Sequence, residues 1–256
     1  SQKIKGKDYK MNTFIIGNGE SRKDFDLESL RGKGKIYGCN ALYRDFTPDV
    51  LFATDQDIIL EIIQENYCLE NECRFSDWDI IPAEMYEIFQ EGLGPVIHIG
   101  ERESAKGFSV IGEGSGGFDV TYIIWTSKEK INSFPNQHSF DTGSNAMQSA
   151  SENKGTVYLL GFDLRETEDG KNNNIYKNTN GYSPSDHKMT NISKWISEIV
   201  SIIENNPDIS YCRVDDIKNS SEKWNDMLSY VMHDLPNLRC ISYNEFESEI
   251  NAEALL

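Results

Sequence analysis

Small and polar residues follow a short apolar run near the start of the sequence, in a pattern that could bind a phosphate. Gly17, Asn18, Gly19 and Ser21 come directly after residues 13–16, which are β-branched, aromatic and aliphatic. Glycines at such a point let backbone N–H groups approach a phosphate or ribose, and Asn and Ser side chains add hydrogen bonds. An ordinary β-turn has the same composition, so both interpretations stay open.

Two further apolar runs also end in small or polar residues. Asn40 follows one of them, and Gly161, Phe162 and Asp163 follow another. In open α/β sheets, ligands bind outside the carboxyl ends of the strands. The three motifs together therefore predict a ligand site at one edge of a sheet.

The pair Asp55 and Asp57 follows a fourth apolar run and could bind a divalent cation. Carboxylate oxygens are the ligands that Mg²⁺ prefers, and an Asp-x-Asp pair can hold a metal together with a diphosphate. Asp57 can instead cap a helix that begins at Ile58. We favour capping and expect no metal site.

Among the four histidines, His187 has the setting best suited to chemistry, because it precedes a predicted helix over residues 191–203. The positive end of a helix dipole favours the neutral imidazole, which is the form that a general base needs. A solvated histidine at a helix start explains the same position. We interpret His98, His138 and His233 as structural or exposed.

Composition limits the classes of function. The formal net charge of −17 repels a nucleic-acid backbone and an anionic membrane, although a modified nucleobase stays open as an acceptor. No apolar run approaches the ~18 residues of a membrane span, and no secretory signal is visible. The five cysteines include no C-x-x-C pair, so we expect reduced thiols in a cytoplasmic protein. Assembly into a homo-oligomer stays open.

Short apolar runs alternate with helical patterns, which predicts an α/β fold with a mainly parallel sheet and helices on both faces. We expect a polar extension over residues 1–11 and a single Rossmann-like domain over residues 12–256. The predicted strands are 13–16, 35–39, 49–54, 95–99, 120–125, 156–160, 209–214 and 238–242, and the predicted helices are 58–63, 145–151, 191–203 and 221–232.

Two segments are predicted to be loops. Residues 107–117 carry five glycines. Residues 166–186 are polar, and their only sizeable apolar side chains are those of Ile175, Tyr176 and Tyr182. A loop of this length inside a compact domain is usually functional or disordered. We expect a mobile lid, with a disordered insertion as the alternative.

The order of these motifs resembles that of the bacterial sialyltransferases that use CMP-sialic acid. It also looks like the related domain of motility accessory factors and 6-hydroxymethylpterin pyrophosphokinase-like proteins. The resemblance covers roughly residues 12–215 and consists of Gly17-Asn18-Gly19 with Ser21, Cys39-Asn40, Thr142-Gly143, Leu160-Gly161-Phe162-Asp163, and His187.

The sialyltransferase resemblance implies a metal-independent transferase without a cofactor, which binds a nucleotide-sugar donor and an acceptor hydroxyl. It implies that the nucleotide is held by Asn18, Asn40, Thr142, Gly143 and the segment Gly161, Phe162 and Asp163, and that His187 is the base. Arg165 stands where the family has a tyrosine on the leaving phosphate, and a guanidinium also binds phosphate. Tyr176 or Tyr182 could supply a second phosphate contact.

We therefore expect a glycosyltransferase in which Arg165 neutralises the leaving phosphate and His187 deprotonates the acceptor. The pterin-enzyme resemblance leaves open a pyrophosphoryl transferase on a small heterocyclic alcohol. That chemistry normally needs Mg²⁺, for which Asp55 and Asp57 would become important. A non-catalytic nucleotide-binding module is the third hypothesis.

Overall fold

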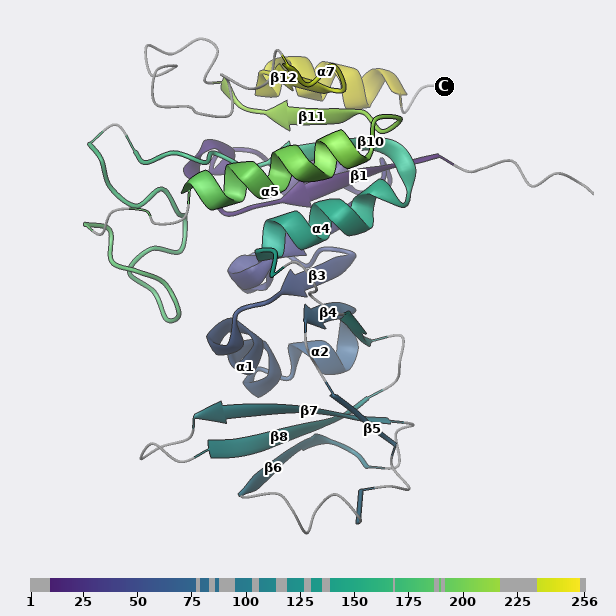
Figure 1. Cartoon of the computed structure of the whole chain (residues 1–256), viewed down its shortest axis with the longest axis vertical. Coiled ribbons are helices and arrows are strands. Elements are labelled where there is room, and N and C mark those ends of the chain that lie inside the picture. The colour runs from purple at the N-terminus through teal and green to yellow at the C-terminus, as the bar shows by residue number, and fades with distance from the viewer. Residues whose placement is uncertain are drawn as a thin grey trace, which may run out of the picture. The chain divides into compact units, whose positions relative to one another are not determined.

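The computed structural model describes residues 10–76, 79–82, 86–87, 95–102, 106–113, 119–126, 130–134, 139–167, 169–186, 189, 192–216 and 234–253. The chain divides into two compact units, whose helices and strands are labelled in Figure 1. Unit 1 comprises Ser1–Tyr37 and Ala146–Leu256, and unit 2 comprises Gly38–Asn145.

Unit 1 contains parallel strands in the order β12-β11-β10-β1. Their bounds are Leu238–Ile241 for β12, Tyr211–Val214 for β11, Lys154–Leu160 for β10 and Met11–Ile16 for β1. Ile16 pairs with Leu160, and Leu160 pairs with Val214. Because β1, β10 and β11 end level with one another, the residues that follow these three strands emerge at the same edge of the sheet.

Helices cover both faces of this sheet. Phe246 of α7 (Tyr243–Glu253) packs against Phe14 and Tyr158, with ring centroids 5.9 and 5.1 Å away. Tyr211 lies on the opposite face, because successive strand residues alternate in direction. There its hydroxyl lies 2.5 Å from that of Ser151, the last residue of α4 (Thr142–Ser151).

Unit 1 also contains a longer helix, α5 (Ile192–Asn205), and two short 3-10 helices. Helix α5 buries the apolar side chains of Ile196, Ile199, Ile202 and Ile203. Two short 3-10 helices, η1 (Glu20–Arg22) and η2 (Leu27–Leu30), follow β1. Strand β2 (Lys35–Cys39) and helix α4 each span a boundary between the units.

Unit 2 contains two groups of strands. The first group consists of three parallel strands, β3 (Val50–Ala53), β4 (Cys73–Ser76) and β9 (Ile131–Phe134), in which β4 pairs with both others. Unit 2 also contains the helices η3 (Asn40–Arg44), α1 (Gln56–Gln64) and α2 (Tyr67–Glu70). A second, mainly antiparallel sheet has the order β5-β7-β8-β6, formed by Asp79–Pro82, Lys106–Glu113, Asp119–Thr126 and Val96–Gly100.

The predicted fold class is confirmed: the protein is α/β, with a mainly parallel, Rossmann-like sheet flanked by helices. All eight predicted strands are present, as are the helices predicted at 58–63, 145–151 and 191–203. The helix predicted at 221–232 lies outside the described residues. Among the described residues, no helix combines the length and the apolar character needed to cross a membrane.

Two local predictions are wrong. The predicted loop at 107–117 is a strand up to Glu113, because β7 pairs antiparallel with β8 in a ladder that includes Gly107 and Gly112. Residues 114–117 lie outside the described residues. The predicted cap at Asp57 is wrong because α1 begins earlier, at Gln56, so that Asp57 lies in the first turn and Asp55 at the N-cap. The side chain of Asp55 makes no capping hydrogen bond there, and Asp57 is in a position that the helix dipole favours.

Candidate functional site

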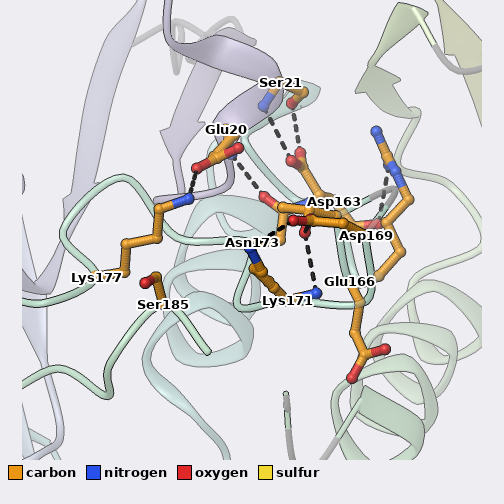
Figure 2. A pocket seen from close by; sticks show the side chains of 11 residues that line it. Glu20, Ser21, Asp163, Glu166, Asp169, Lys171, Asn173, Lys177 and Ser185 are labelled. Carbon is orange, nitrogen blue, oxygen red and sulfur yellow. Dashed lines mark hydrogen bonds and ion pairs between the residues drawn. The ribbon is translucent and has the colours of Figure 1, made fainter. Parts of the chain in front are cut away.

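A pocket of about 590 Å³ lies in unit 1, beside the segments that follow β1 and β10 (Figure 2). The first segment contributes Glu20 and Ser21. The second contributes the remaining lining residues, which are Asp163, Arg165, Glu166, Thr167, Asp169, Lys171, Asn173, Lys177 and Ser185. Of the predicted site residues, the pocket lining therefore includes Ser21, Asp163 and Arg165.

The turns after β1 and β10 contact each other directly, and their glycines make this contact possible. The N–H of Gly17 donates to the Leu160 carbonyl at 2.8 Å, and the N–H of Gly19 donates to the Gly161 carbonyl at 2.9 Å. A Cβ atom at Gly19 would lie 2.6 Å from that Gly161 oxygen. The glycines are thus explained by the approach of two turns, independently of a ligand.

Other backbone N–H groups of the first turn also donate within the protein. The N–H of Glu20 donates to Asn173 Oδ1 at 2.8 Å, and that of Ser21 donates to Asp163 Oδ2 at 2.9 Å. Asn18 is 9% exposed and its Oδ1 accepts from Arg22 Nη2 at 3.2 Å. The nucleotide-binding role predicted for this turn stays a prediction, and it would require some of these bonds to be exchanged.

Asp163 holds the two turns together. Its side chain is buried, and its two carboxylate oxygens accept from the N–H and the hydroxyl of Ser21. Burial raises the pKa of the Asp163 carboxyl above its ordinary value, Asp215 raises it further, and Arg165 and Ser21 oppose the shift. Asp163 therefore positions Ser21 at the pocket.

Arg165, predicted to bind phosphate, forms a bidentate ion pair with Asp215. Its Nη1 lies 2.6 Å from Asp215 Oδ2, and its Nη2 lies 3.2 Å from Oδ1. Arg213, which is fully buried, lies 3.4 Å from the same carboxylate and donates to the carbonyls of Phe162 and Asp163. Arg165 thus belongs to a buried ionic network that supports the second turn.

The segment 169–186, predicted to be part of a lid, packs against the first turn. The N–H of Ile175 donates to the Asn18 carbonyl at 2.8 Å, and Lys177 forms an ion pair with Glu20. Tyr176 is 5% exposed and its ring centroid lies 5.8 Å from that of Tyr182. Within the described residues, the two tyrosines lie outside the pocket lining.

The predicted residues Asn40, Thr142 and Gly143 belong to unit 2. Thr142 is 3% exposed, and its hydroxyl donates to Asn40 Oδ1 at 3.0 Å while it accepts from the N–H of Thr54 at 3.3 Å. Asn40 has a left-handed backbone, with φ 54°, and Gly143 lies in the first turn of α4. This cluster joins the ends of β2 and β3 to the start of α4.

His187 lies outside the described residues, but the chain on either side of it is placed. Ser185 lines the pocket, and Met189 Sδ accepts from the N–H of Asn173, another lining residue, at 3.4 Å. In the part of the chain that the structure describes, no group of three or more His, Cys, Asp or Glu side chains is arranged to hold a metal ion.

Sequence reasoning missed several residues of this site. Asp215 directly follows β11, so the rule that selected Asp163 at a strand end could also have selected it. Lys171 was noticed only as part of a segment similar to the pterin-enzyme group, and Lys177 carried no signal beyond that of a charged loop residue. Arg22 and Arg213 donate to carbonyls of the two turns, and they are charged residues that the sequence alone gives no reason to bury.

Comparisons with protein-family models, with curated proteins and with solved structures give no match to this chain. The assignment of a function therefore depends on the chemistry of the site and on the motifs of the sequence.

The contact between the two turns gives a first testable prediction. Gly161→Ala should lower the free energy of unfolding by about 1–3 kcal/mol more than Gly32→Ala. Both glycines have left-handed φ values, +70° and +78°, so both variants incur similar backbone strain. A Cβ at Gly161 would lie 2.7 Å from the Gly17 oxygen, whereas nothing lies within 4 Å of one at Gly32. Urea unfolding measures the difference, and equal losses would show that the turns can separate at no cost.

Proposed function

We propose that this protein is a glycosyltransferase that binds the nucleotide part of a nucleotide-sugar donor in the pocket of unit 1. The observation that carries the proposal is the presence of Lys171 and Lys177 in a pocket at the carboxyl ends of β1 and β10. Rossmann-like sheets bind nucleotides at this edge, and lysine ammonium groups bind phosphate as point charges. Hydroxyls of the donor can be bound by the carboxylate of Glu166.

In this proposal, the two lysines of the pocket bind the phosphate, and Arg165 supports the turn after β10. Lys171 and Lys177 neutralise the charge that develops on the phosphate as the sugar leaves. They take the role that the sequence suggested for Arg165, because the Arg165 guanidinium is held in two hydrogen bonds by Asp215. Arg165 is then a positioning residue for the turn after β10.

The chemical step needs a base. The acceptor hydroxyl forms a bond to the anomeric carbon as the bond from that carbon to the phosphate oxygen breaks, and His187 takes the hydroxyl proton. The resemblance of the motif order to that of the sialyltransferases supports this role and an inverting, metal-independent reaction. The pocket-lining position of Ser185 is consistent with it.

The binding part of the proposal is tested with a panel of CMP-, UDP- and GDP-sugars, with ATP included. A ligand that binds only the folded state raises the apparent stability by about 2.7 kcal/mol at a hundred times its Kd, so thermal shift finds it. For the ligand that binds, Lys177→Gln should weaken binding about tenfold in calorimetry, because a charge-assisted hydrogen bond is lost. Lys194→Gln is the matched control, since Lys194 is also paired with a carboxylate, that of Glu198, outside the pocket lining.

Donor hydrolysis without an acceptor tests the reaction class. Release of free sugar from one donor supports the glycosyltransferase. Mg²⁺-dependent release of AMP from ATP would indicate the pyrophosphoryl transferase instead, and tight nucleotide binding without turnover would indicate a binding module. If no member of the panel binds, the proposal is wrong.

A further inference from the structure

Every basic side chain that lines the pocket in the described residues is ion-paired with a carboxylate. The three pairs are Arg165 with Asp215 at 2.6 Å, Lys171 with Asp169 at 2.8 Å, and Lys177 with Glu20. Figure 2 shows the carboxylates of Asp169 and Glu20 at the ammonium groups of Lys171 and Lys177. A phosphate that enters this pocket must therefore compete with protein carboxylates for its cations.

Burial separates these pairs into two kinds. The Arg165 and Asp215 side chains are only 10% and 3% exposed. Breaking such a pair leaves a charge without compensation in a medium of low dielectric constant, so Asp215 keeps its partner. The lysine pairs are far more exposed, with 51% for Lys171 and 28% for Lys177. Water screens exposed ion pairs and leaves them weak, so each lysine can exchange its carboxylate for a phosphate.

Two exchangeable cations in one pocket match a ligand with two phosphate groups. We propose that the pocket selects a donor linked through a nucleoside diphosphate, and that Glu20 and Asp169 act as internal competitors that the two phosphates displace. This inference rests on the proposed function. A donor with a single phosphate displaces one carboxylate and leaves the other lysine paired, so that it gains only part of the available attraction.

Because Glu20 and Asp169 compete with the phosphates, replacing either one should tighten nucleotide binding, whereas replacing a lysine weakens it. Glu20→Gln removes the anion from Lys177 but keeps the backbone N–H of residue 20, which donates to Asn173 Oδ1 at 2.8 Å. Asp169→Asn keeps an oxygen that can accept from Thr167, as Asp169 does now at 2.6 Å. Each variant should therefore bind a diphosphate more tightly than the wild type, by about two- to fivefold, the range expected for loss of a partly exposed opposing charge.

The experiment uses calorimetry on the full chain with pairs of nucleotides that share a base: UDP with UMP, GDP with GMP, and CDP with CMP. For the base that binds, the diphosphate should bind about tenfold more tightly than the monophosphate. Lys171→Gln and Lys177→Gln should each lower the ratio of the monophosphate Kd to the diphosphate Kd. Lys194→Gln and Glu28→Gln are the controls, because both residues form ion pairs outside the pocket lining, and neither variant should alter the ratio.

Three results would overturn the inference. They are equal affinity for the diphosphate and the monophosphate, a ratio that is unchanged in both lysine variants, and weaker binding in Glu20→Gln. All three occur with a protein that binds nucleotide, so they leave the proposed function intact. Failure of every nucleotide and nucleotide sugar to bind would instead contradict the proposed function itself. Thermal unfolding of each variant, compared with the wild type, establishes that it is folded under the conditions of the titration.

Discussion

Asp215→Ala is expected to lower the free energy of unfolding by about 3–5 kcal/mol, which is the range for removing one partner of a buried ion pair. The Asp215 carboxylate is 3% exposed and lies 2.6 Å from Arg165 Nη1 and 3.4 Å from Arg213 Nη2. Its removal leaves two guanidinium groups, one of them fully buried, without their common counter-ion. Urea unfolding, analysed by linear extrapolation, measures the loss.

The matched control for Asp215 is Glu28→Ala. Glu28 also forms a carboxylate–arginine pair, at 2.9 Å from Arg31 Nε, but its side chain is 65% exposed. Water replaces the lost partner there, so the effect on stability should be small. If both variants lost the same stability, burial would not be the factor that gives Asp215 its importance.

Asp215→Ala should also weaken nucleotide binding. Arg213 donates to the carbonyls of Phe162 at 3.1 Å and of Asp163 at 2.6 Å, and thereby fixes the turn that carries Asp163. Asp163 in turn holds Ser21 at the pocket. Loss of Asp215 therefore disturbs the pocket through the turn after β10, in addition to its effect on global stability.

The parallel sheet of unit 1 could be predicted because the carboxyl-terminal halves of β1 and β10 and the whole of β11 are buried. Residues 156–160 are mostly apolar and lie between Gly155 and Gly161, a pattern that is typical of a central parallel strand. Strands β4 (Cys73–Ser76) and β9 (Ile131–Phe134) of unit 2 were not predicted, because they are short and contain a polar residue, Arg74 or Asn132. Their pairing is set by neighbouring strands, which local sequence does not report.

Part of the lining of the pocket could be predicted from the sequence, but Asn40, selected by the same rule, belongs to unit 2, and the connections between the residues could not be predicted. The strand-end rule selected Ser21 and Asp163, and both line one pocket. The rule could not show that both carboxylate oxygens of Asp163 accept hydrogen bonds from Ser21, or that Arg165 forms an ion pair with Asp215. Such partners come from segments far apart in sequence, and residue type alone does not determine which of several acceptors a donor meets.

The lysines that carry the proposed function illustrate the same limit. In the sequence, Lys171 and Lys177 are charged residues of a polar loop, and a solvated role is their ordinary interpretation. Their importance appears only when the segment 169–186 packs against the turn after β1, through Ile175 and Asn173. That packing turns two loop charges into the cations of a pocket.

His187→Ala is expected to lower kcat by about 10²–10⁴ while leaving the Kd for nucleotide close to that of the wild type. A general base acts on the acceptor hydroxyl, not on the nucleotide, so its loss affects turnover more than binding. The chain reaches this residue from Ser185, which lines the pocket, and continues to Met189, which accepts from Asn173. Single-turnover rates with saturating donor, together with calorimetry, separate the two effects.

The control for His187 is His98→Gln, which changes a histidine of β6 in the separate sheet of unit 2. His98 Nδ1 accepts from Trp125 Nε1 at 3.0 Å, and its Nε2 lies 2.8 Å from the Tyr86 hydroxyl, so its role is to order that sheet. Turnover in His98→Gln should match that of the wild type. Added imidazole should restore part of the rate in His187→Ala, because a small base can enter the space of the missing side chain, and should do nothing for His98→Gln. A wild-type rate in His187→Ala would remove this residue from the mechanism and leave the acceptor to be deprotonated by one of the pocket carboxylates, of which Glu166 is the first to replace.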